Sequence, residues 1–573
     1  MEFGLFAVIG IVILVGVAAL SKRFGVAAPI VLVIVGVGLS YLPGVPSIEV
    51  PHEWVLDGVL PPILYAAAIS VPVVDFRRNL GTIASLSVVL VIVTALAVGF
   101  LLYMLLPELN LAAAIALGAI ISPPDAVAAT SIGRRLGLPP RLLTVLEGEG
   151  LVNDATALVL LRSAVAAAAG GVLTPWATVG DFVYAVVVAI AIGLAAGFVT
   201  VWVRSRITDS VLATAVSIAV PFVAFMPTEA LHASGVLAVV VAGLYTGHAA
   251  PRAFSVQVRA SDRINWRTIQ FLLESAVFLV IGLELRTLIE HVDSDVLTVG
   301  ASVVIGLIAV LALTILRFLW VGPLVLGLRR TAQRAERSTM RLNLALGRGR
   351  GTGGSAASAE RKQRMERVYE IKRADLEQRR REGIDWRGGV VIGWSGMRGV
   401  VTLAAAQSLP DNTPYRPQLI LIAFTVAVVT LVLQGGTLPA LIRLLRIKGV
   451  DEAQDHRDLA LLLDELSYSG LTVLEDSSSI IGEQADPDIL ERVRQSSFLR
   501  AESAWERTRE SDSATHENPH STYRTLRLAV VAAERERLHD LRSRGAYPSR
   551  IFAEAEAMLD SEETRLRPTR AEH

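Results

Sequence analysis

The sequence predicts an all-α membrane protein with about thirteen transmembrane helices and a helical cytoplasmic tail. Of its 573 residues, 52% are hydrophobic and only 19% are charged, whereas about a quarter of the residues in a typical soluble protein are charged. The apolar residues gather at 1–328 and 388–447. They form repeated runs close to the roughly 20 residues that a helix needs to cross a bilayer.

These runs divide the chain into four parts. Residues 1–328 hold predicted helices 1–11, 329–387 form a charged cytoplasmic loop, 388–446 hold helices 12 and 13, and 447–573 form the cytoplasmic tail. We expect a charged helical run at 360–381 in the loop and a packed helical face at 523–541 in the tail. The predicted spans are 3–20, 26–42, 54–70, 83–106, 111–131, 143–169, 181–203, 210–227, 232–247, 269–285, 296–326, 389–408 and 418–445.

Charge in the short loops predicts the orientation. One set of alternate loops carries thirteen basic residues, whereas the other set carries only Arg286 and Arg416. Because cytoplasmic loops are enriched in Lys and Arg, the basic set lies inside the cell. We therefore expect the N-terminus outside, and the long loop and the tail in the cytoplasm. The basic set is Lys22, Arg23, Arg77, Arg78, Arg134, Arg135, Arg141, Arg204, Arg206, Arg252, Arg259, Arg263 and Arg267.

Several function classes are excluded or disfavoured by composition. The chain has no cysteine and a formal net charge of zero, so it has no thiolate chemistry and shows no charge suited to nucleic acid. No glycine-rich phosphate loop, metal-ligand histidine pair or activated nucleophile is recognisable. We therefore predict a protein that is not an enzyme and needs no cofactor.

Helix 5 contains a break with an acid beside it. Pro123 and Pro124 precede Asp125, and two prolines remove two backbone donors. Irregular backbone at membrane depth is tolerated only inside protein or along a cavity. We expect Asp125 to neutralise the positive end of a half-helix; the alternative is a simple kink with Asp125 at the cytoplasmic edge.

Helix 6 carries the strongest candidate for chemistry. Residues 147–154 read Glu-Gly-Glu-Gly-Leu-Val-Asn-Asp and place three acids and an amide in one span. An isolated carboxylate in the membrane is stable either protonated or paired with a cation, because an unpaired charge is costly there. Proton and metal ion then compete for Asp154, with Asn153 as ligand or brace. The alternative is a structural hydrogen-bond cluster.

Helix 12 contains an intramembrane arginine in a glycine-rich segment. Arg398 lies in Gly393-Trp-Ser-Gly-Met-Arg-Gly399, where three glycines weaken the helix. Arginine keeps its charge and needs an acid, unless it snorkels to an interface. We predict Glu149 as its partner and Glu147 as second choice. A possible second pair joins Glu274 in helix 10 with Arg317 in helix 11.

The two broken spans point to a single site. The fifth and twelfth helices are seven apart and therefore cross the membrane in opposite senses. Interrupted helices at matching positions of two halves are typical of inverted repeats with a binding site at the midplane. We therefore expect Asp125, Asn153, Asp154 and Arg398 to surround one site.

Five segments in sequence order resemble motifs of NhaP/NHE-type monovalent cation/proton antiporters, the sodium/hydrogen exchanger family. The resemblance covers roughly residues 1–446 apart from the long loop, and five motifs on the appropriate spans make it specific. The segments are Val59-Leu-Pro-Pro-Ile-Leu64, Asp125-Ala-Val127, Glu147 to Asp154, Ser234-Gly-Val-Leu-Ala238 and Gly396-Met-Arg-Gly399.

This resemblance implies an NhaA-like antiporter fold, in which a core with crossing helices 5 and 12 moves against a dimerisation domain. It implies that Asp154 binds the transported monovalent cation or a proton, beside Asn153 and the backbone of Pro124 and Asp125. It also implies a buried pair between Glu149 and Arg398, a homodimer and electroneutral exchange.

Three positions depart from the family's pattern. Ala66 stands where an acid is frequent, Gly150 where a serine helps to coordinate the ion, and Pro124 where threonine is common. The site has thus lost side-chain oxygens, which makes K+ a second option beside Na+.

We therefore predict a secondary active antiporter that exchanges Na+ or K+ for H+ across the plasma membrane by alternating access. The alternatives within transport are a K+/H+ antiporter, a proton-coupled transporter of an organic solute, and a channel. A membrane sensor that signals through the tail is a further alternative. The expected partners are small monovalent cations, protons, the lipid bilayer and a second copy of the chain.

Overall fold

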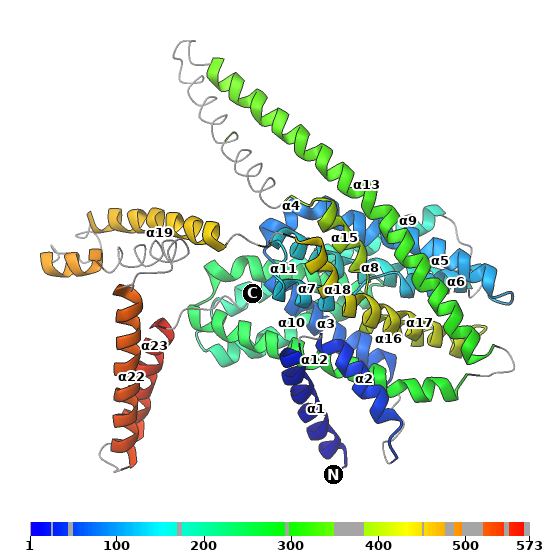
Figure 1. The fold of residues 1–573 in the computed structure, drawn as a ribbon, viewed down its shortest axis with the longest axis horizontal. Helices are drawn as coiled ribbons and strands as arrows, with labels where there is room; N and C mark the ends of the chain where they lie inside the picture. Colours follow the sequence, from blue (N-terminus) through cyan, green and yellow to red (C-terminus); the bar gives the residue numbers. More distant parts are fainter. Residues whose placement is uncertain are drawn as a thin grey trace. The chain divides into compact units, whose positions relative to one another are not determined.

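The structure is all-helical in the part of the chain that it describes. The computed structural model describes residues 2–24, 27–43, 50–168, 175–292, 297–348, 369, 383–447, 449, 452–475, 486–495, 519–543 and 549–566. These residues form helices and turns without a strand (Figure 1). They divide into two compact units, Met1–Ile447 and Lys448–His573.

The first unit contains the apolar helices. Before the first break they are α1 (Glu2–Phe24), α2 (Ala28–Ser40), the π-helical turn η1 (Trp54–Val59), α3 (Leu60–Ser70), α4 (Val73–Ala84), η2 (Ser85–Leu90), α5 (Val91–Leu105) and α6 (Leu111–Ile121). Then come α7 (Ala126–Arg135), α8 (Pro140–Ala168), α9 (Pro175–Arg204), α10 (Ser210–Ala230), α11 (Gly235–Ala253), α12 (Val256–Glu290) and α13 (Val299–Arg348). The last are α15 (Trp386–Trp394), α16 (Val400–Gln407), α17 (Arg416–Thr430), η4 (Leu431–Gly435) and α18 (Gly436–Leu445).

Many of these helices are suited to a bilayer. Among the described residues, eight helices are long and apolar enough to span a membrane, and three shorter apolar helices lie at Val8–Ser21, Ala28–Ser40 and Trp54–Ser70. This agrees with the predicted polytopic class. The total of thirteen spans remains a prediction, because α11 and the two halves of the broken α15–α16 segment are outside both groups.

Helix α13 is longer than the sequence analysis predicts. The predicted eleventh span ends at 326, but the helix continues to Arg348 through the polar start of the predicted loop. Residues such as Arg329 and Arg330 have good helical propensity, so the helix persists beyond its apolar part. The predicted helical run at 360–381 lies outside the described residues, apart from Tyr369.

Two predicted breaks are confirmed. Residues 122–125 separate α6 from α7, and residues 395–399 separate α15 from α16. In the first break, Pro123 and Pro124 lack backbone donors. In the second, Gly396 and Gly399 weaken the helix. The chain is thus interrupted where the sequence makes a continuous helix most costly.

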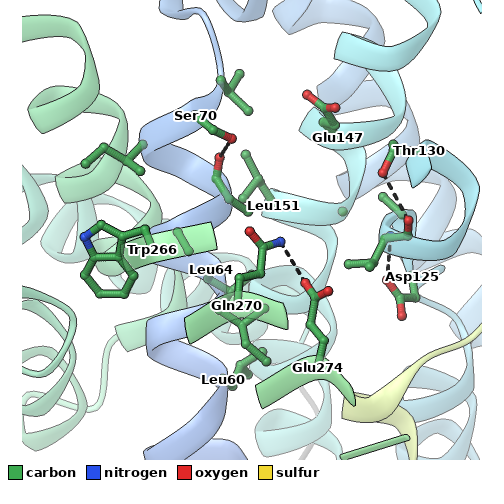
Figure 2. A pocket seen from close by; sticks show the side chains of 18 of the residues that line it. Leu60, Leu64, Ser70, Asp125, Thr130, Glu147, Leu151, Trp266, Gln270 and Glu274 are labelled. Atoms are coloured by element: carbon green, nitrogen blue, oxygen red, sulfur yellow. Dashed lines mark hydrogen bonds between the residues drawn. The ribbon is translucent and has the colours of Figure 1, made fainter. Parts of the chain in front are cut away.

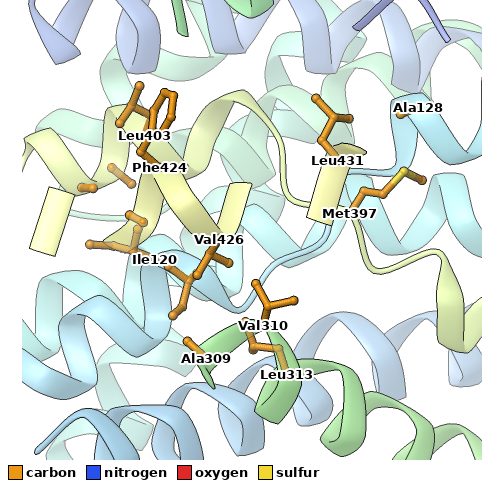
Figure 3. Close-up of a cluster of buried hydrophobic side chains, with 14 of the residues drawn as sticks. Ile120, Ala128, Ala309, Val310, Leu313, Met397, Leu403, Phe424, Val426 and Leu431 are labelled. Carbon is orange, nitrogen blue, oxygen red and sulfur yellow. The ribbon is translucent and has the colours of Figure 1, made fainter. Parts of the chain in front are cut away.

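The helices near the second break share a hydrophobic core with the first break. Figure 3 shows Ile120 of α6 and Ala128 of α7 in the same cluster as Val310 of α13, Leu403 of α16 and Phe424 of α17. The two broken segments are therefore packed into one apolar body. This packing positions their irregular backbone away from lipid, as membrane-embedded breaks require.

Helix α12 packs closely against α2. We call this pair of helices the α12 wall. Gly36 and Gly282 face each other there. A Cβ at Gly36 would overlap the Leu279 carbonyl oxygen, and one at Gly282 would overlap the Val33 carbonyl oxygen. Small residues allow such close contact between membrane helices.

The second unit is helical where it is described. It contains α19 (Glu452–Glu475), a helical segment within 486–495, α22 (Pro519–Ser543) and α23 (Ser549–Leu566). The predicted helical face at 523–541 lies on α22, which packs against α23. Arg527 donates to Glu562 at 2.8 Å, and Arg535 lies 2.7 Å from Glu563.

Candidate ion-binding site

The two breaks meet. The backbone N–H of Asp125 donates to the Met397 carbonyl at 2.6 Å. Arg398 of the second break reaches into the first, where its Nε donates to the Ile121 carbonyl at 2.9 Å and its Nη2 to the Ser122 carbonyl at 3.3 Å. Segments that are far apart in sequence thus satisfy each other's backbone groups, as a break inside a membrane protein must.

The charged residues at the breaks match the ends of the half-helices. Arg398 lies at the carbonyl ends of α6 and α15, and it also donates to the Gly396 carbonyl. Asp125 lies at the N-terminus of α7, where it accepts from the Val127 N–H at 2.8 Å. A positive group at a helix C-terminus and a negative group at an N-terminus are both stabilising. The structure therefore places Asp125 at the positive end of a half-helix, as the sequence predicts.

Asn153 and Asp154 of α8 lie beside the first break. Asn153 is fully buried, and its Nδ2 donates to the Pro124 carbonyl at 2.6 Å. Its Oδ1 has no hydrogen-bond partner among the described residues. An unpaired buried oxygen is costly. The amide therefore braces the break and keeps one buried acceptor that no described residue uses.

Asp154 lines a cavity of about 670 Å³. The cavity also touches Asp125, Pro124 and Glu274, so it brings together residues of α8, the first break and α12. Figure 2 shows Asp125 and Glu274 on separate elements around this space. Among the described residues, no Lys or Arg forms an ion pair with Asp154. Its carboxylate is therefore available to a cation or a proton.

The departures from the family's pattern are also at this cavity. Ala66 and Gly150 both line it. The two positions where the family's pattern has an acid and a serine therefore add no side-chain oxygen to the cavity. Gly150 has a second reason to be small, because a Cβ there would lie 2.7 Å from the Ala126 Cβ. The packing of α8 against the start of α7 thus explains a glycine where a serine would supply a ligand.

The predicted pair between Glu149 and Arg398 is wrong. Glu149 accepts from Arg317 of α13 instead, with Nη1–Oε1 at 2.5 Å and Nη2–Oε2 at 2.9 Å. Glu149 is 1% exposed and Arg317 3% exposed. This bidentate geometry is strong and specific. Arg398 reaches backbone carbonyls of the breaks and does not need a carboxylate.

The predicted second pair is wrong for the same reason, since Arg317 is already bound to Glu149. Glu274 accepts from Gln270 Nε2 at 2.7 Å and lines the cavity (Figure 2). Glu147, the second choice for Arg398, pairs with Arg134 of α7. Gln270 is not among the predicted site residues, although its position four residues before Glu274 is the spacing of neighbours on a helix face.

One substitution tests how closely the second break approaches the first. A Cβ at Gly399 would overlap Oδ2 of Asp125, so we expect Gly399→Ala to destabilise the protein by ~1–3 kcal/mol, the usual cost of overpacking. Thermal unfolding in detergent measures this. Gly436→Ala is the control, because no atom lies within 4 Å of a Cβ there. Equal stability of the two variants would contradict the close approach.

Comparisons with known proteins identify the family of the chain. The family described as "Sodium/hydrogen exchanger, transmembrane" matches residues 9–444. An uncharacterized Na(+)/H(+) exchanger of Mycobacterium tuberculosis is 28% identical over 573 residues, which cover 98% of this chain and 96% of the relative. A sodium, potassium, lithium and rubidium/H(+) antiporter of Bacillus pumilus is 28% identical over 455 residues, 76% of this chain and 61% of the relative.

A solved structure has a similar fold. The sodium proton antiporter MjNhaP1 of Methanocaldococcus jannaschii matches with a TM-score of 0.55 and 17% identity, covering 78% of this chain and all of the MjNhaP1 chain. At this identity the likeness concerns the fold, and it agrees with the predicted NhaA-like antiporter fold. With the family match over most of the first unit, these findings show that the chain belongs to the sodium/hydrogen exchanger family of cation/proton antiporters.

Proposed function

We propose that this protein exchanges Na+ or K+ for H+ across the plasma membrane, and that Asp154 binds either the cation or the proton. One observation carries this proposal: Asp154 lines a large cavity next to two crossing helix breaks, without a basic partner among the described residues. A carboxylate in that place is stable only when it is protonated or holds a cation. Competition between the two ions couples their transport.

The ligands around Asp154 determine which cation the site binds. Asn153 offers Oδ1, Asp125 offers its carboxylate, and the carbonyl of Pro124 already accepts from Asn153. Ala66 and Gly150 on the cavity wall supply no side-chain oxygen. Such a loose cage suits more than one monovalent ion. The named ions of the Bacillus pumilus relative, sodium, potassium, lithium and rubidium, support a broad selectivity.

The cycle we propose alternates access to this site. The cavity extends from Asp154 to Arg134 at the end of α7 and to Arg263 and Arg267 near the start of α12, which belong to the basic set that the charge distribution assigns to the cytoplasm. The cavity then opens inward, the N-terminus is outside, and the tail is cytoplasmic. The core that carries α6–α8 and α15–α16 moves against the wall that contains α12. We also propose a homodimer and electroneutral one-for-one exchange.

Proton flux in proteoliposomes tests this function. We expect an imposed pH gradient to dissipate when Na+ is added and also when K+ or Li+ is added, because the site lacks the oxygens that would select one ion. N-methylglucamine, a large organic cation, is the control that should leave the gradient intact. Dissipation by Na+ alone would show that backbone and water replace the missing oxygens. No dissipation by any of the three cations would contradict the proposed function.

A further inference from the structure

The cavity is also lined by Glu274, a carboxylate that the proposed site does not use. Glu274 lies on α12 and lines the same space as Asp154 and Asp125. Gln270, one turn earlier, donates to Glu274 Oε1 at 2.7 Å. Figure 2 shows this pair on α12, with Asp125 on a separate element across the cavity. The amide holds one carboxylate oxygen, and the other accepts no hydrogen bond from a described residue.

Glu274 differs from the acids around it that have structural partners. Glu147 pairs with Arg134, Glu149 with Arg317, and Asp262 with Arg204. Within the described residues, no Lys or Arg forms an ion pair with Glu274, and its one hydrogen-bond donor is the neutral Gln270. An acid at membrane depth without a basic partner marks an ion pathway.

Glu274 and Asp154 line the cavity from different helices, α12 and α8. Helix α12 packs against α2 through Gly36 and Gly282, whereas α8 packs against α6, α4 and α7. A movement of the broken-helix core relative to α12 therefore changes the distance between the two carboxylates. Both carboxylates line the cavity in this structure, and the proposed movement would separate them when the site faces the other side of the membrane.

We propose that Glu274 is a second cation ligand, which receives the cation from Asp154, or delivers it, on the side to which the cavity opens. Gln270 positions the carboxylate for this transfer. This inference rests on the proposed function, because it concerns the same transported ion. It gives the two sides of the protein different requirements: Asp154 is needed for binding from either side, whereas Glu274 is needed only for binding from the cavity side.

Everted and right-side-out membrane vesicles test this asymmetry, because an added cation reaches the cytoplasmic side in the first and the outer side in the second. We expect Glu274→Gln to raise the KM for the cation about tenfold in everted vesicles, equivalent to ~1.4 kcal/mol of binding free energy. The KM in right-side-out vesicles and the maximal rate should remain at wild-type values. Glu274→Asp, which keeps the charge, should recover part of the affinity.

Glu290→Gln is the matched control, since Glu290 is at the exposed end of the same helix and pairs with Arg286. It should leave both KM values unchanged. An equal rise in KM on both sides for Glu274→Gln would indicate a structural role and overturn the inference, as would wild-type KM values on both sides. Absence of cation-dependent flux in the wild-type protein would instead overturn the proposed function itself, and the inference with it.

Discussion

The Asp154→Asn variant is expected to lose exchange completely while it remains folded. Asparagine has nearly the same shape as aspartate, but it can neither take up a proton at this position nor neutralise a cation. Proton flux in proteoliposomes should fall to the level of protein-free vesicles for Na+, K+ and Li+ alike. Because the substitution removes a charge that no basic group among the described residues balances, the midpoint of thermal unfolding should be equal to or above that of the wild type.

The matched control is Asp181→Asn, which makes the same chemical change at an exposed position of α9. This variant should exchange ions at the wild-type rate. Clear cation-dependent proton flux in Asp154→Asn would contradict the assignment of Asp154 as the carrier. In that case Asp125 or Glu274, the other cavity acids without an ion pair among the described residues, would be the next groups to test by the same substitution to the amide.

The position of the site could be predicted from the sequence because local chemistry determines it. Pro123 and Pro124 remove two backbone donors and so favour an interruption of the helix, and the glycines around Arg398 weaken another. Two interruptions at corresponding places in the two halves imply that the breaks meet. The hydrogen bond between Asp125 and Met397 agrees with that expectation. The unusual acids of α8 follow one break closely in sequence, so they had to lie nearby.

The partners of the charged residues could not be predicted in the same way. Helical periodicity gives the face of a helix on which a side chain lies, but it does not give the neighbouring helix. Arg317 and Arg398 both reach Gly396, within 3.0 and 3.1 Å of the position of a Cβ there. Two arginines thus approach the same point from different helices. The packing of α13 against α15 determines that Arg317 is the arginine that binds Glu149.

The guanidinium of Arg398 donates its hydrogen bonds to backbone carbonyl groups, which sequence patterns do not reveal. The carbonyl groups of Ile121 and Ser122 exist as free acceptors only because the helix stops there. A backbone carbonyl acceptor cannot be identified from the type of residue. The sequence alone therefore favours an acidic partner for Arg398, such as Glu149 or Glu147. In a broken membrane helix, an arginine is therefore as well explained by exposed carbonyl groups as by a carboxylate.

Replacement of Arg317 by alanine should destabilise the protein more than Gly399→Ala does. It leaves Glu149 as an unpaired buried acid, which typically costs about 3–5 kcal/mol. It also removes donors to the Ile392 and Ser395 carbonyls at the end of α15. We expect a large fall in the midpoint of thermal unfolding in detergent. A second change, Glu149→Gln, removes the stranded charge and should recover part of that loss.

The Glu149→Gln change also distinguishes the roles of Arg317 and Arg398. Arg398→Ala should also destabilise the protein, because it strips donors from the carbonyl groups of the first break. Glu149→Gln should bring no recovery in that background, since Glu149 still has Arg317 there and the substitution would break an intact pair. Recovery in the Arg398→Ala background but not in the Arg317→Ala background would reverse the assignment of the pair. Coupling that is confined to Glu149 and Arg317 would place the ion pair in the scaffold that holds α8, α13 and α15 together, apart from the arginine that supports the breaks.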